Sequence, residues 1–189
     1  MNLLRKLFSK EKSEKTSEPS SVDFERAKKI FFDYYCNHFY LSRDREGDEY
    51  YKFGISREQE KIWRDQYISL WVSKLSTDDL EPLDKLRGSY AIEALPELIK
   101  MADQGDSYAK LMFADAIWSI KEKEGIDVDL YQQARRVAID LWTSLLEGNI
   151  WISEHHKGDI PKQYMKTQQA SSPEEYIRNY ARDQLNKIN

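Results

Sequence analysis

The feature that most constrains this chain is the stretch from Ala94 to Trp118, ALPELIKMADQGDSYAKLMFADAIW. Apolar residues recur at helical spacing on both sides of Gly105, which indicates two amphipathic helices. Gly105 suits the left-handed residue that ends a helix, and Asp106 or Ser107 can cap the next helix. The first stripe holds Leu95, Leu98, Ile99 and Ala102, and the second holds Tyr108, Leu111, Met112, Asp115 and Trp118. The stretch therefore predicts a helical hairpin whose second stripe is apolar except at Asp115.

The segments before the hairpin are predicted from local signals. Aromatic residues at three- and four-residue spacing predict a first helix over residues 22–41, and the charged residues 42–48 predict a loop. Ser56 and Gln59 match a capping box, which opens a second helix that runs through Ser76. The predicted apolar face of this second helix carries Ile62, Trp63, Tyr67, Leu70, Trp71 and Leu75. Residues 77–88 are expected to form a connection with a short helical turn.

The segments after the hairpin are also predicted to be helical. Asp127 or Asp129 can cap a helix that ends at Gly148. Residues 150–171 mix glycine, proline and polar residues, which predicts a partly ordered loop with one short helix around 162–168.

The last helix is predicted to begin at Ser172-Pro173, because a serine cap is followed there by proline and two glutamates. No segment shows sustained β-type alternation, so the sequence predicts an all-α fold. A chain of 189 residues suits one domain of ordinary size and a tail. We expect residues 22–189 to form this domain and residues 1–21 to be a flexible basic segment and linker.

Charge and composition narrow the classes of function. The net charge is -4, and residues 1–16 carry five Lys or Arg and two Glu, so the rest of the chain is more acidic. Clustered positive charge for nucleic-acid binding is missing from that acidic body. No apolar run is long enough to span a bilayer, and the N-terminus lacks the pattern of a secretory signal. The single cysteine, Cys36, fits a reducing compartment, so we expect the cytoplasm.

The N-terminal residues offer one route to a membrane. Leu3, Leu4, Leu7 and Phe8 share a helical side among basic residues, a pattern that can lie on an anionic membrane surface. The alternative is a frayed leader or a segment that docks on its own domain. The first interpretation predicts a protein that is peripheral at the inner face of a membrane.

Comparison of the chain with itself indicates an internal repeat of 43 residues. It aligns Gly105 with Gly148, and similar residues flank the two glycines. The run around Ala102, Gly105 and Ala109 resembles the Sel-one-like repeat, a relative of the tetratricopeptide repeat. Phe113-Ala114 replaces the Leu-Gly pair usual in that family. The resemblance implies one good repeat at about 89–122 and a degenerate one at about 130–152, in which Ile152 stands where the second alanine is expected.

Membership in such a family has consequences for fold and function. It implies a short irregular α-solenoid, or a helical bundle, built of antiparallel helix hairpins. Ala102, Gly105, Ala109 and Gly148 would be architectural residues in this arrangement. Proteins of this kind are generally scaffolds for protein–protein contact, and this role is implied by the resemblance.

Motifs for chemistry are weak in this sequence. His155-His156 with Asp159 could be imagined as metal ligands, but adjacent side chains do not converge readily, so a structural or solvated role is favoured. Cys36 has no basic partner nearby in sequence that would lower the pKa of its thiol, which favours a buried cysteine. No phosphate loop, serine elbow or zinc-protease pair occurs. We therefore predict no metal, no cofactor and no enzymatic activity.

The favoured function is a protein-binding module, with an immunity-type or regulatory inhibitor of a toxin or enzyme as a narrower form. The partner is expected to be another protein and not nucleic acid, and the oligomeric state stays open. Aromatic and histidine side chains are the expected contacts: Tyr35, Tyr67, Trp151, His155 and His156. Trp63, Trp118 and Trp142 are expected in the core. Two alternatives are a membrane-peripheral adaptor that uses the N-terminal leucines and an enzyme without a recognisable motif.

Overall fold

The computed structural model describes residues 21–122 and 125–188, and all regular structure in these residues is helical. The all-α prediction is therefore confirmed. The elements are α1 (Ser21–Asp33), α2 (His38–Leu41), α3 (Arg45–Lys52), α4 (Arg57–Ser73), α5 (Glu81–Gly88), a 3-10 turn (Ile92–Ala94), α6 (Leu95–Met101), α7 (Ser107–Lys121), α8 (Val128–Glu147), α9 (Glu154–Asp159), α10 (Lys162–Thr167) and α11 (Pro173–Ile188). None of these helices is long and apolar enough to cross a membrane.

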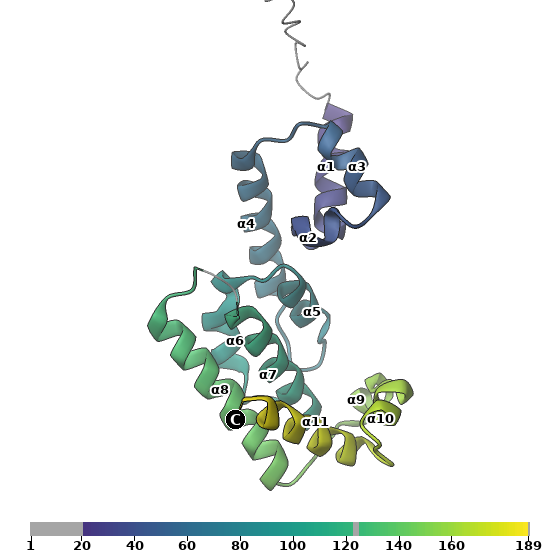
Figure 1. The fold of residues 1–189 in the computed structure, drawn as a ribbon, viewed down its shortest axis with the longest axis vertical. Helices are drawn as coiled ribbons and strands as arrows, with labels where there is room; N and C mark the ends of the chain where they lie inside the picture. The colour runs from purple at the N-terminus through teal and green to yellow at the C-terminus, as the bar shows by residue number, and fades with distance from the viewer. Residues whose placement is uncertain (1–20, 123–124, 189) are drawn as a thin grey trace, which may run out of the picture.

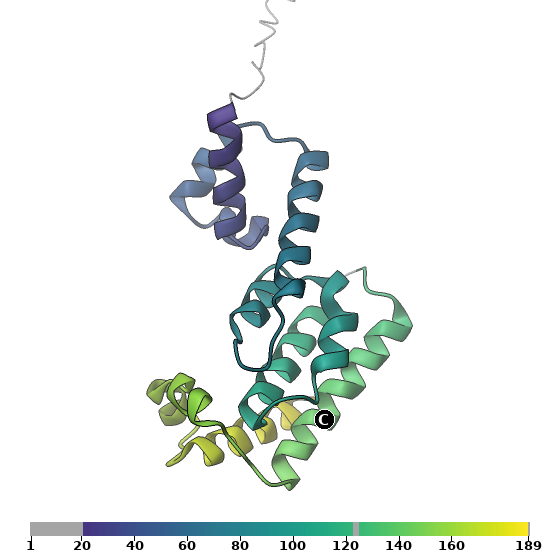
Figure 2. The same ribbon diagram turned by 180° about the vertical axis from the view of Figure 1, so that it is seen from behind.

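The helices form two lobes that α4 connects (Figure 1). The N-terminal lobe consists of α1, α2 and α3, and the C-terminal lobe consists of α5 to α11, as the view from behind also shows (Figure 2). Each lobe has its own cluster of buried side chains. Trp63 and Tyr67 of α4 belong to the N-terminal cluster and Ile68 belongs to the C-terminal one, whereas Trp71 packs against both. Helix α4 therefore contributes to both cores.

The first helix is shorter than predicted. Helix α1 ends at Asp33, and the chain turns at Tyr35 and Cys36, which have φ angles of 59° and 52°. Asn37 then caps α2, because its side chain accepts a hydrogen bond from the backbone N–H of Phe39. The Asn37 amide also donates to the carbonyl of Gly88 at 2.8 Å. The prediction of one helix over residues 22–41 is wrong, since this contact with the other lobe favours the turn.

Residues 42–48 were predicted to be a loop, which is right for residues 42–44 and wrong from Arg45 on, where α3 begins. Asp44 accepts a hydrogen bond from the backbone N–H of Glu46 and caps α3. A Cβ on Gly47 would lie 1.9 Å from the carbonyl oxygen of Leu41, so only glycine fits there. Tyr50 of α3 is buried and its ring stacks on Phe31 of α1 at 5.5 Å. Packing against α1 therefore stabilises a helix despite its charged sequence.

Helix α4 begins as predicted, since Ser56 Oγ accepts a hydrogen bond from the backbone N–H of Gln59. It ends at Ser73, three residues before the predicted end. The predicted apolar face is only partly buried, because Ile62 and Leu70 are 50% and 42% exposed.

The predicted hairpin is present as α6 and α7. Gly105 has a φ angle of 78°, and a Cβ there would lie 2.7 Å from Thr77 Cβ. Asp106 caps α7 by accepting a hydrogen bond from the backbone N–H of Ala109 at 2.8 Å. Ala102 and Ala109 are buried, which lets the adjoining helices approach closely.

Helices α8 and α11 cover α7 and complete the C-terminal lobe. Asp127 caps α8, and α8 ends at Gly148, as predicted. Gly148 has an extended backbone with a φ angle of -85°, so its turn differs in geometry from the turn at Gly105. The connection from α8 to α11 contains two short helices, α9 and α10, whereas the sequence predicted only one of them, α10. Ser172 Oγ accepts from the N–H of Glu175 at the start of α11, as expected for a cap.

Two expectations fall on residues that the structure does not describe. The flexible N-terminal segment, apart from Ser21, is one of them. The other is the membrane contact through Leu3, Leu4, Leu7 and Phe8.

Candidate functional site

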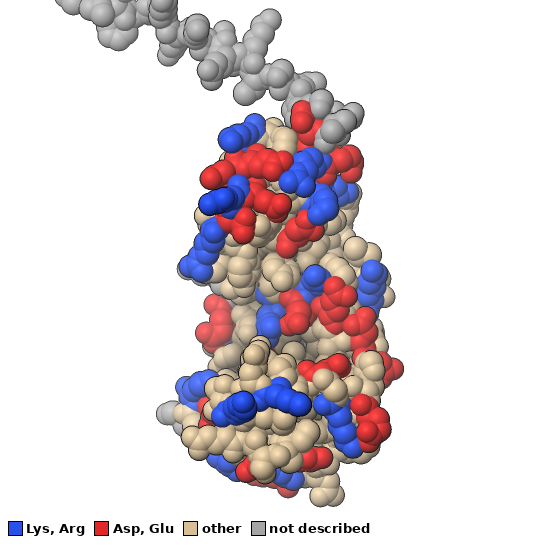
Figure 3. Space-filling model, turned by 90° about the vertical axis from the view of Figure 1, so that its right-hand side faces the viewer, with Lys and Arg blue, Asp and Glu red and all other residues tan. Residues whose placement is uncertain are grey.

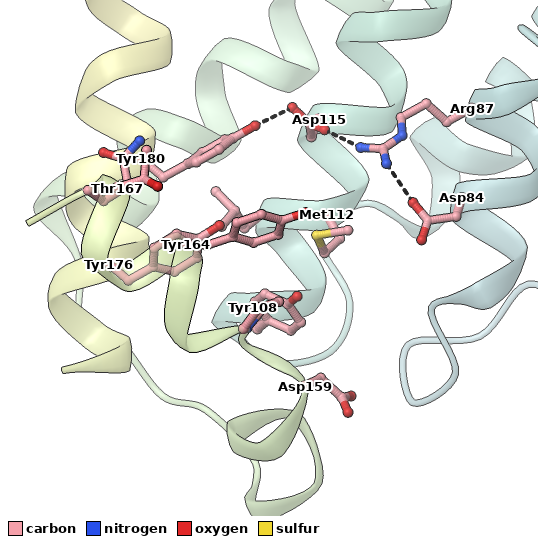
Figure 4. A pocket seen from close by; sticks show the side chains of 13 residues that line it. Asp84, Arg87, Tyr108, Met112, Asp115, Asp159, Tyr164, Thr167, Tyr176 and Tyr180 are labelled. Atoms are coloured by element: carbon pink, nitrogen blue, oxygen red, sulfur yellow. Dashed lines mark hydrogen bonds and ion pairs between the residues drawn. The ribbon is translucent and has the colours of Figure 1, made fainter. Parts of the chain in front are cut away.

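A groove of about 460 Å³ opens in the C-terminal lobe between α5, α7, α11 and the segment that contains α9 and α10 (Figure 4). We call it the main groove. Its lining consists of Asp84, Arg87, Tyr108, Leu111, Met112, Asp115, Asp159, Pro161, Tyr164, Thr167, Gln168, Tyr176 and Tyr180. A second hollow adjoins it, since Asp84 and Arg87 line both. The second hollow is completed by Tyr35, Tyr40, Gly88, Tyr90, Trp118, Ser119 and Glu122. The volume of the main groove lies within the range of about 300–1,000 Å³ that is typical of binding sites.

Helical spacing explains how these side chains come together. Tyr108, Met112 and Asp115 lie on one side of α7, at intervals of four and three residues. Tyr176 and Tyr180 lie one turn apart on α11 and point at the same groove. The polar residue in the second stripe of the hairpin, Asp115, therefore faces the groove.

A chain of polar contacts runs along one side of the main groove (Figure 4). The Tyr180 hydroxyl donates to Asp115 Oδ1 at 2.6 Å, and Arg87 Nη1 donates to Asp115 Oδ2 at 2.6 Å. Arg87 Nη2 donates to Asp84 Oδ1 at 2.7 Å. These contacts tie α11, α7 and α5 together, and they place one guanidinium between two carboxylates.

The tyrosine hydroxyls of the groove are held in their neutral form. Burial, with a smaller effect of neighbouring Tyr176, raises the pKa of Tyr108 to about 12. Burial and the charge of Asp115 raise the pKa of Tyr176 to about 12 and also raise the pKa of Tyr180. A neutral phenol is a hydrogen-bond donor and an aromatic surface rather than a nucleophile. The tyrosines of the groove are therefore suited to bind a ligand by hydrogen bonds and ring contacts.

A buried ion pair holds α9, which carries part of the groove wall. Asp106 Oδ2 accepts hydrogen bonds from the backbone N–H of Ser153 at 2.7 Å and from His156 Nδ1 at 2.8 Å. His156 Nε2 donates to the backbone carbonyl of Asp78 at 3.2 Å. The Asp106 carboxylate and the Asp78 carbonyl are both acceptors, so the His156 ring links them as a hydrogen-bond donor.

Asp106 is ionised in this environment. Burial opposes the charged form, but hydrogen bonds from Ala109, Ser153 and His156 outweigh it and hold the pKa of Asp106 below its usual range. Asp106 and His156 are 3% and 2% exposed, so this pair is shielded from water. The pair links the turn between α6 and α7 to α9, and thereby fixes one side of the main groove.

The histidine pair does not form a convincing metal centre. One ligand atom each from His155, His156 and Asp159 lie within 4.8 Å of one another, so the three side chains gather at the end of α9. Both nitrogens of His156 are already bonded to Asp106 and Asp78. Only His155 and Asp159 stay available, whereas a zinc site takes three or four protein ligands.

The residues predicted from the sequence to contact a partner are divided by the structure. Tyr67 is 3% exposed in the N-terminal core and His156 is 2% exposed, so the prediction that these two side chains present a surface is corrected. Tyr35 lines the second hollow, His155 is exposed, and Trp151 is 64% exposed. Trp63 and Trp142 are in the core as expected, whereas Trp118 is only partly buried.

The tyrosines of the main groove were not among the predicted contacts. Tyr108 was placed on the second stripe of the hairpin, and Tyr164 lies in the short helix predicted around residues 162–168, but neither position pointed to a groove. The one signal that pointed here was Asp115, a carboxylate on an otherwise apolar stripe.

The surface charge is mixed around the site. On the face that carries α3, α9 and α10, acidic and basic side chains are interspersed, and no broad basic area is visible there (Figure 3). Cys36 is buried, and burial raises the pKa of its thiol to about 12, which makes it a poor nucleophile. Comparison of the chain with known protein families, with curated proteins and with solved structures gave no match.

Proposed function

We propose that this chain is a protein-binding helical module and that the main groove holds a segment of the partner. One observation carries the proposal: four tyrosines from three helices line an open groove, with Tyr164 exposed, Tyr180 partly buried, and Tyr108 and Tyr176 largely buried in its wall. Tyrosine gives a large contact area at low cost in conformational entropy, and it is enriched where binding energy concentrates. The groove is also braced by the contacts of Arg87 and Asp115, so little ordering is needed when a partner binds.

The resemblance to Sel-one-like repeats supports the same function. The hairpin of α6 and α7 supplies the buried alanines and the glycine turn of that pattern. In this proposal the hairpin is the repeat unit, and its helix α7 presents the groove together with α5, α10 and α11. A narrower form of the proposal is an immunity-type or regulatory inhibitor that acts on a toxin or enzyme in the cytoplasm.

The groove can be tested with a photo-crosslinking phenylalanine analogue at Tyr164. Tyr51 is the matched control, because the two side chains are 51% and 49% exposed and Tyr51 lies on α3 in the other lobe. In cells that make the full chain, we expect the Tyr164 variant to give a discrete crosslinked species and the Tyr51 variant to give none.

A blocking substitution adds a second criterion. Thr167→Arg places a bulky side chain at the edge of the groove and should abolish the crosslink from position 164. Gln132→Arg makes the same chemical change on the exposed surface of α8 and should leave it intact. Equal crosslinking from positions 164 and 51, or a crosslink that survives Thr167→Arg, would count against the groove as the binding site.

A further inference from the structure

The main groove and the second hollow have an excess of negative charge. Their combined lining contains four carboxylates, from Asp84, Asp115, Asp159 and Glu122, and one guanidinium, from Arg87. Arg87 is bonded to both Asp84 and Asp115, so these three groups together keep one negative charge. Glu122 is paired with Lys121 at 2.6 Å.

Asp159 contributes a second negative charge, and its carboxylate lies within 4.8 Å of a ring nitrogen of His155 and of His156. Among residues 21–122 and 125–188, no Lys, Arg or His side chain forms an ion pair with it. It is exposed at the end of α9 and projects beside the tyrosines, below Tyr108 in the view of Figure 4. The groove thus presents negative charge without a lysine or arginine partner at Asp159 and one net negative charge at the Arg87 contacts, with tyrosine rings beside them (Figure 4).

Tyrosine and tryptophan rings add attraction for cations. The face of an aromatic ring carries partial negative charge and attracts ammonium or guanidinium groups within about 6 Å. This chain already uses such contacts in the second hollow. Lys121 Nζ lies 3.5 Å from the Trp118 ring centroid, and Lys85 Nζ lies 5.6 Å from that of Tyr35. In the main groove, the ring of Tyr164 is 51% exposed and has no such cation among the described contacts, whereas the buried ring of Tyr108 faces the His156 ring at 5.7 Å.

From this arrangement we propose that the partner segment is basic, and that its arginine or lysine side chains bind in the main groove against the tyrosines, Asp159 and the carboxylates that flank Arg87. The inference rests on the proposed function and deepens it by naming the chemistry of the partner. Charge complementarity of this kind steers association and selects against acidic partners. The acidic lining also disfavours nucleic acid and anionic membranes as occupants of the groove.

The test measures binding of three fluorescent peptides of equal length to the full chain. One contains arginine and tyrosine, the second replaces each arginine with citrulline, and the third replaces each with glutamate. Citrulline keeps the shape of arginine but carries no charge, so it isolates the contribution of the cation. We expect binding of the arginine peptide, at least tenfold weaker binding of the citrulline peptide and none of the glutamate peptide. Binding should weaken from 0.01 M to 0.15 M salt, because screening shortens from about 30 Å to about 8 Å.

Variants locate the effect in the groove. Asp84→Asn with Asp159→Asn removes the unbalanced charge and leaves Arg87 paired with Asp115, so the helices stay bridged. We expect about tenfold weaker binding of the arginine peptide, since each exposed pair contributes about two- to fivefold. Asp103→Asn with Asp140→Asn makes the same charge change on exposed residues outside the groove and should alter the affinity less than twofold. Circular dichroism and thermal melting confirm that both double variants are folded.

The possible results separate this inference from the proposed function. Equal binding of the arginine and citrulline peptides, or an equal loss in both double variants, would overturn the basic partner. If no peptide binds while the Tyr164 crosslink is present, the groove binds a partner that is not basic, and only the inference fails. If deletion of residues 1–16 alone strengthens binding of the arginine peptide, the occupant is the basic N-terminal segment of this chain, and the assignment to a partner is also overturned.

Discussion

The buried core of the N-terminal lobe and that of the C-terminal lobe are built from different kinds of side chain. The buried cluster of the N-terminal lobe is mostly aromatic, with Phe31, Tyr50, Trp63 and Tyr67 in contact across α1, α3 and α4. The cluster of the C-terminal lobe combines leucine and isoleucine with many alanines, which are Ala91, Ala94, Ala102, Ala114, Ala116, Ala134, Ala138 and Ala181. Small residues let helices pack closely along regular stripes, whereas large rings fill the space between short helices that lie at irregular angles.

The lobes also differ in whether their charged groups are buried. The C-terminal lobe contains the enclosed pair of Asp106 and His156, and its removal leaves polar groups without partners. The N-terminal lobe keeps its ion pairs at the surface, as in the contact of Arg26 with Glu49, whose side chains are 41% and 43% exposed. Water can replace such exposed contacts at little cost. Substitutions of charged groups should therefore affect the C-terminal lobe far more.

The largest effect is expected for Asp106→Ala. The change leaves the buried His156 ring without its partner and removes the acceptor for the N–H groups of Ala109 and Ser153. Breaking a buried pair in this way lowers the free energy of unfolding by about 3–5 kcal/mol, measured by urea denaturation. Glu49→Gln is the control in the N-terminal lobe and should change stability little. A loss of similar size in both variants would break the comparison between the lobes.

The same prediction has a signature in pH. The pKa of Asp106 is lower in the folded protein than in the unfolded chain, where it is about 3.9. Its contribution is complete above the unfolded value and is lost as the pH falls through the folded one. The stability difference between the natural chain and Asp106→Ala should therefore be constant near neutral pH and narrow below about pH 4. A gap that stays constant down to pH 2 would mean that the carboxylate is not the group that matters.

Substitution of one glycine in each lobe, Gly54 and Gly105, compares how tightly the two turns are packed. Gly54 and Gly105 both have left-handed φ angles, 61° and 78°, but a Cβ on Gly54 meets nothing within 4 Å, whereas one on Gly105 would approach Thr77 Cβ at 2.7 Å. Gly54→Ala should cost only the backbone strain, about 1 kcal/mol, while Gly105→Ala adds overpacking and should cost about 2–3 kcal/mol. Thermal unfolding of the two variants measures the difference. Equal losses would show that the contact with Thr77 relaxes easily.

The comparison also explains which parts of the fold could be predicted. The hairpin of α6 and α7 follows from signals within a few residues, namely the stripes, Gly105 and the cap at Asp106. In the N-terminal lobe, the chain leaves the helix after Asp33 and turns at Tyr35 and Cys36, because Asn37 reaches the carbonyl of Gly88, which is 51 residues away in the sequence. Local patterns carry no information about such a contact.

The candidate site was harder to predict than the fold for the same reason. Asp115 stood out in its stripe, but its partners Arg87 and Tyr180 lie 28 and 65 residues away. His156 was predicted to be at the surface, since nothing local shows that Asp106 draws it inside. The lining of the groove depends on the tertiary contacts between helices. The sequence predicts the helices better than it predicts these contacts.

The smallest expected effect uses Cys36 as a reporter of the N-terminal lobe. This cysteine is buried with the aromatic cluster, and burial raises the pKa of its thiol to about 12, so a thiol reagent reacts only when the lobe opens. Phe31→Leu removes a ring that stacks on Tyr50 at 5.5 Å. We expect a loss of about 1–1.5 kcal/mol and labelling of Cys36 about tenfold faster.

Ile117→Val is the matched change in the C-terminal lobe, since Ile117 is fully buried and the substitution also costs about 1 kcal/mol. If the lobes open separately, this variant labels Cys36 at the same rate as the natural chain. Helix α4 belongs to both lobes, because Trp71 packs against both clusters, and it is the element through which opening would spread. Equal acceleration by Phe31→Leu and Ile117→Val would therefore show that α4 couples the lobes into one cooperative unit, despite their different cores.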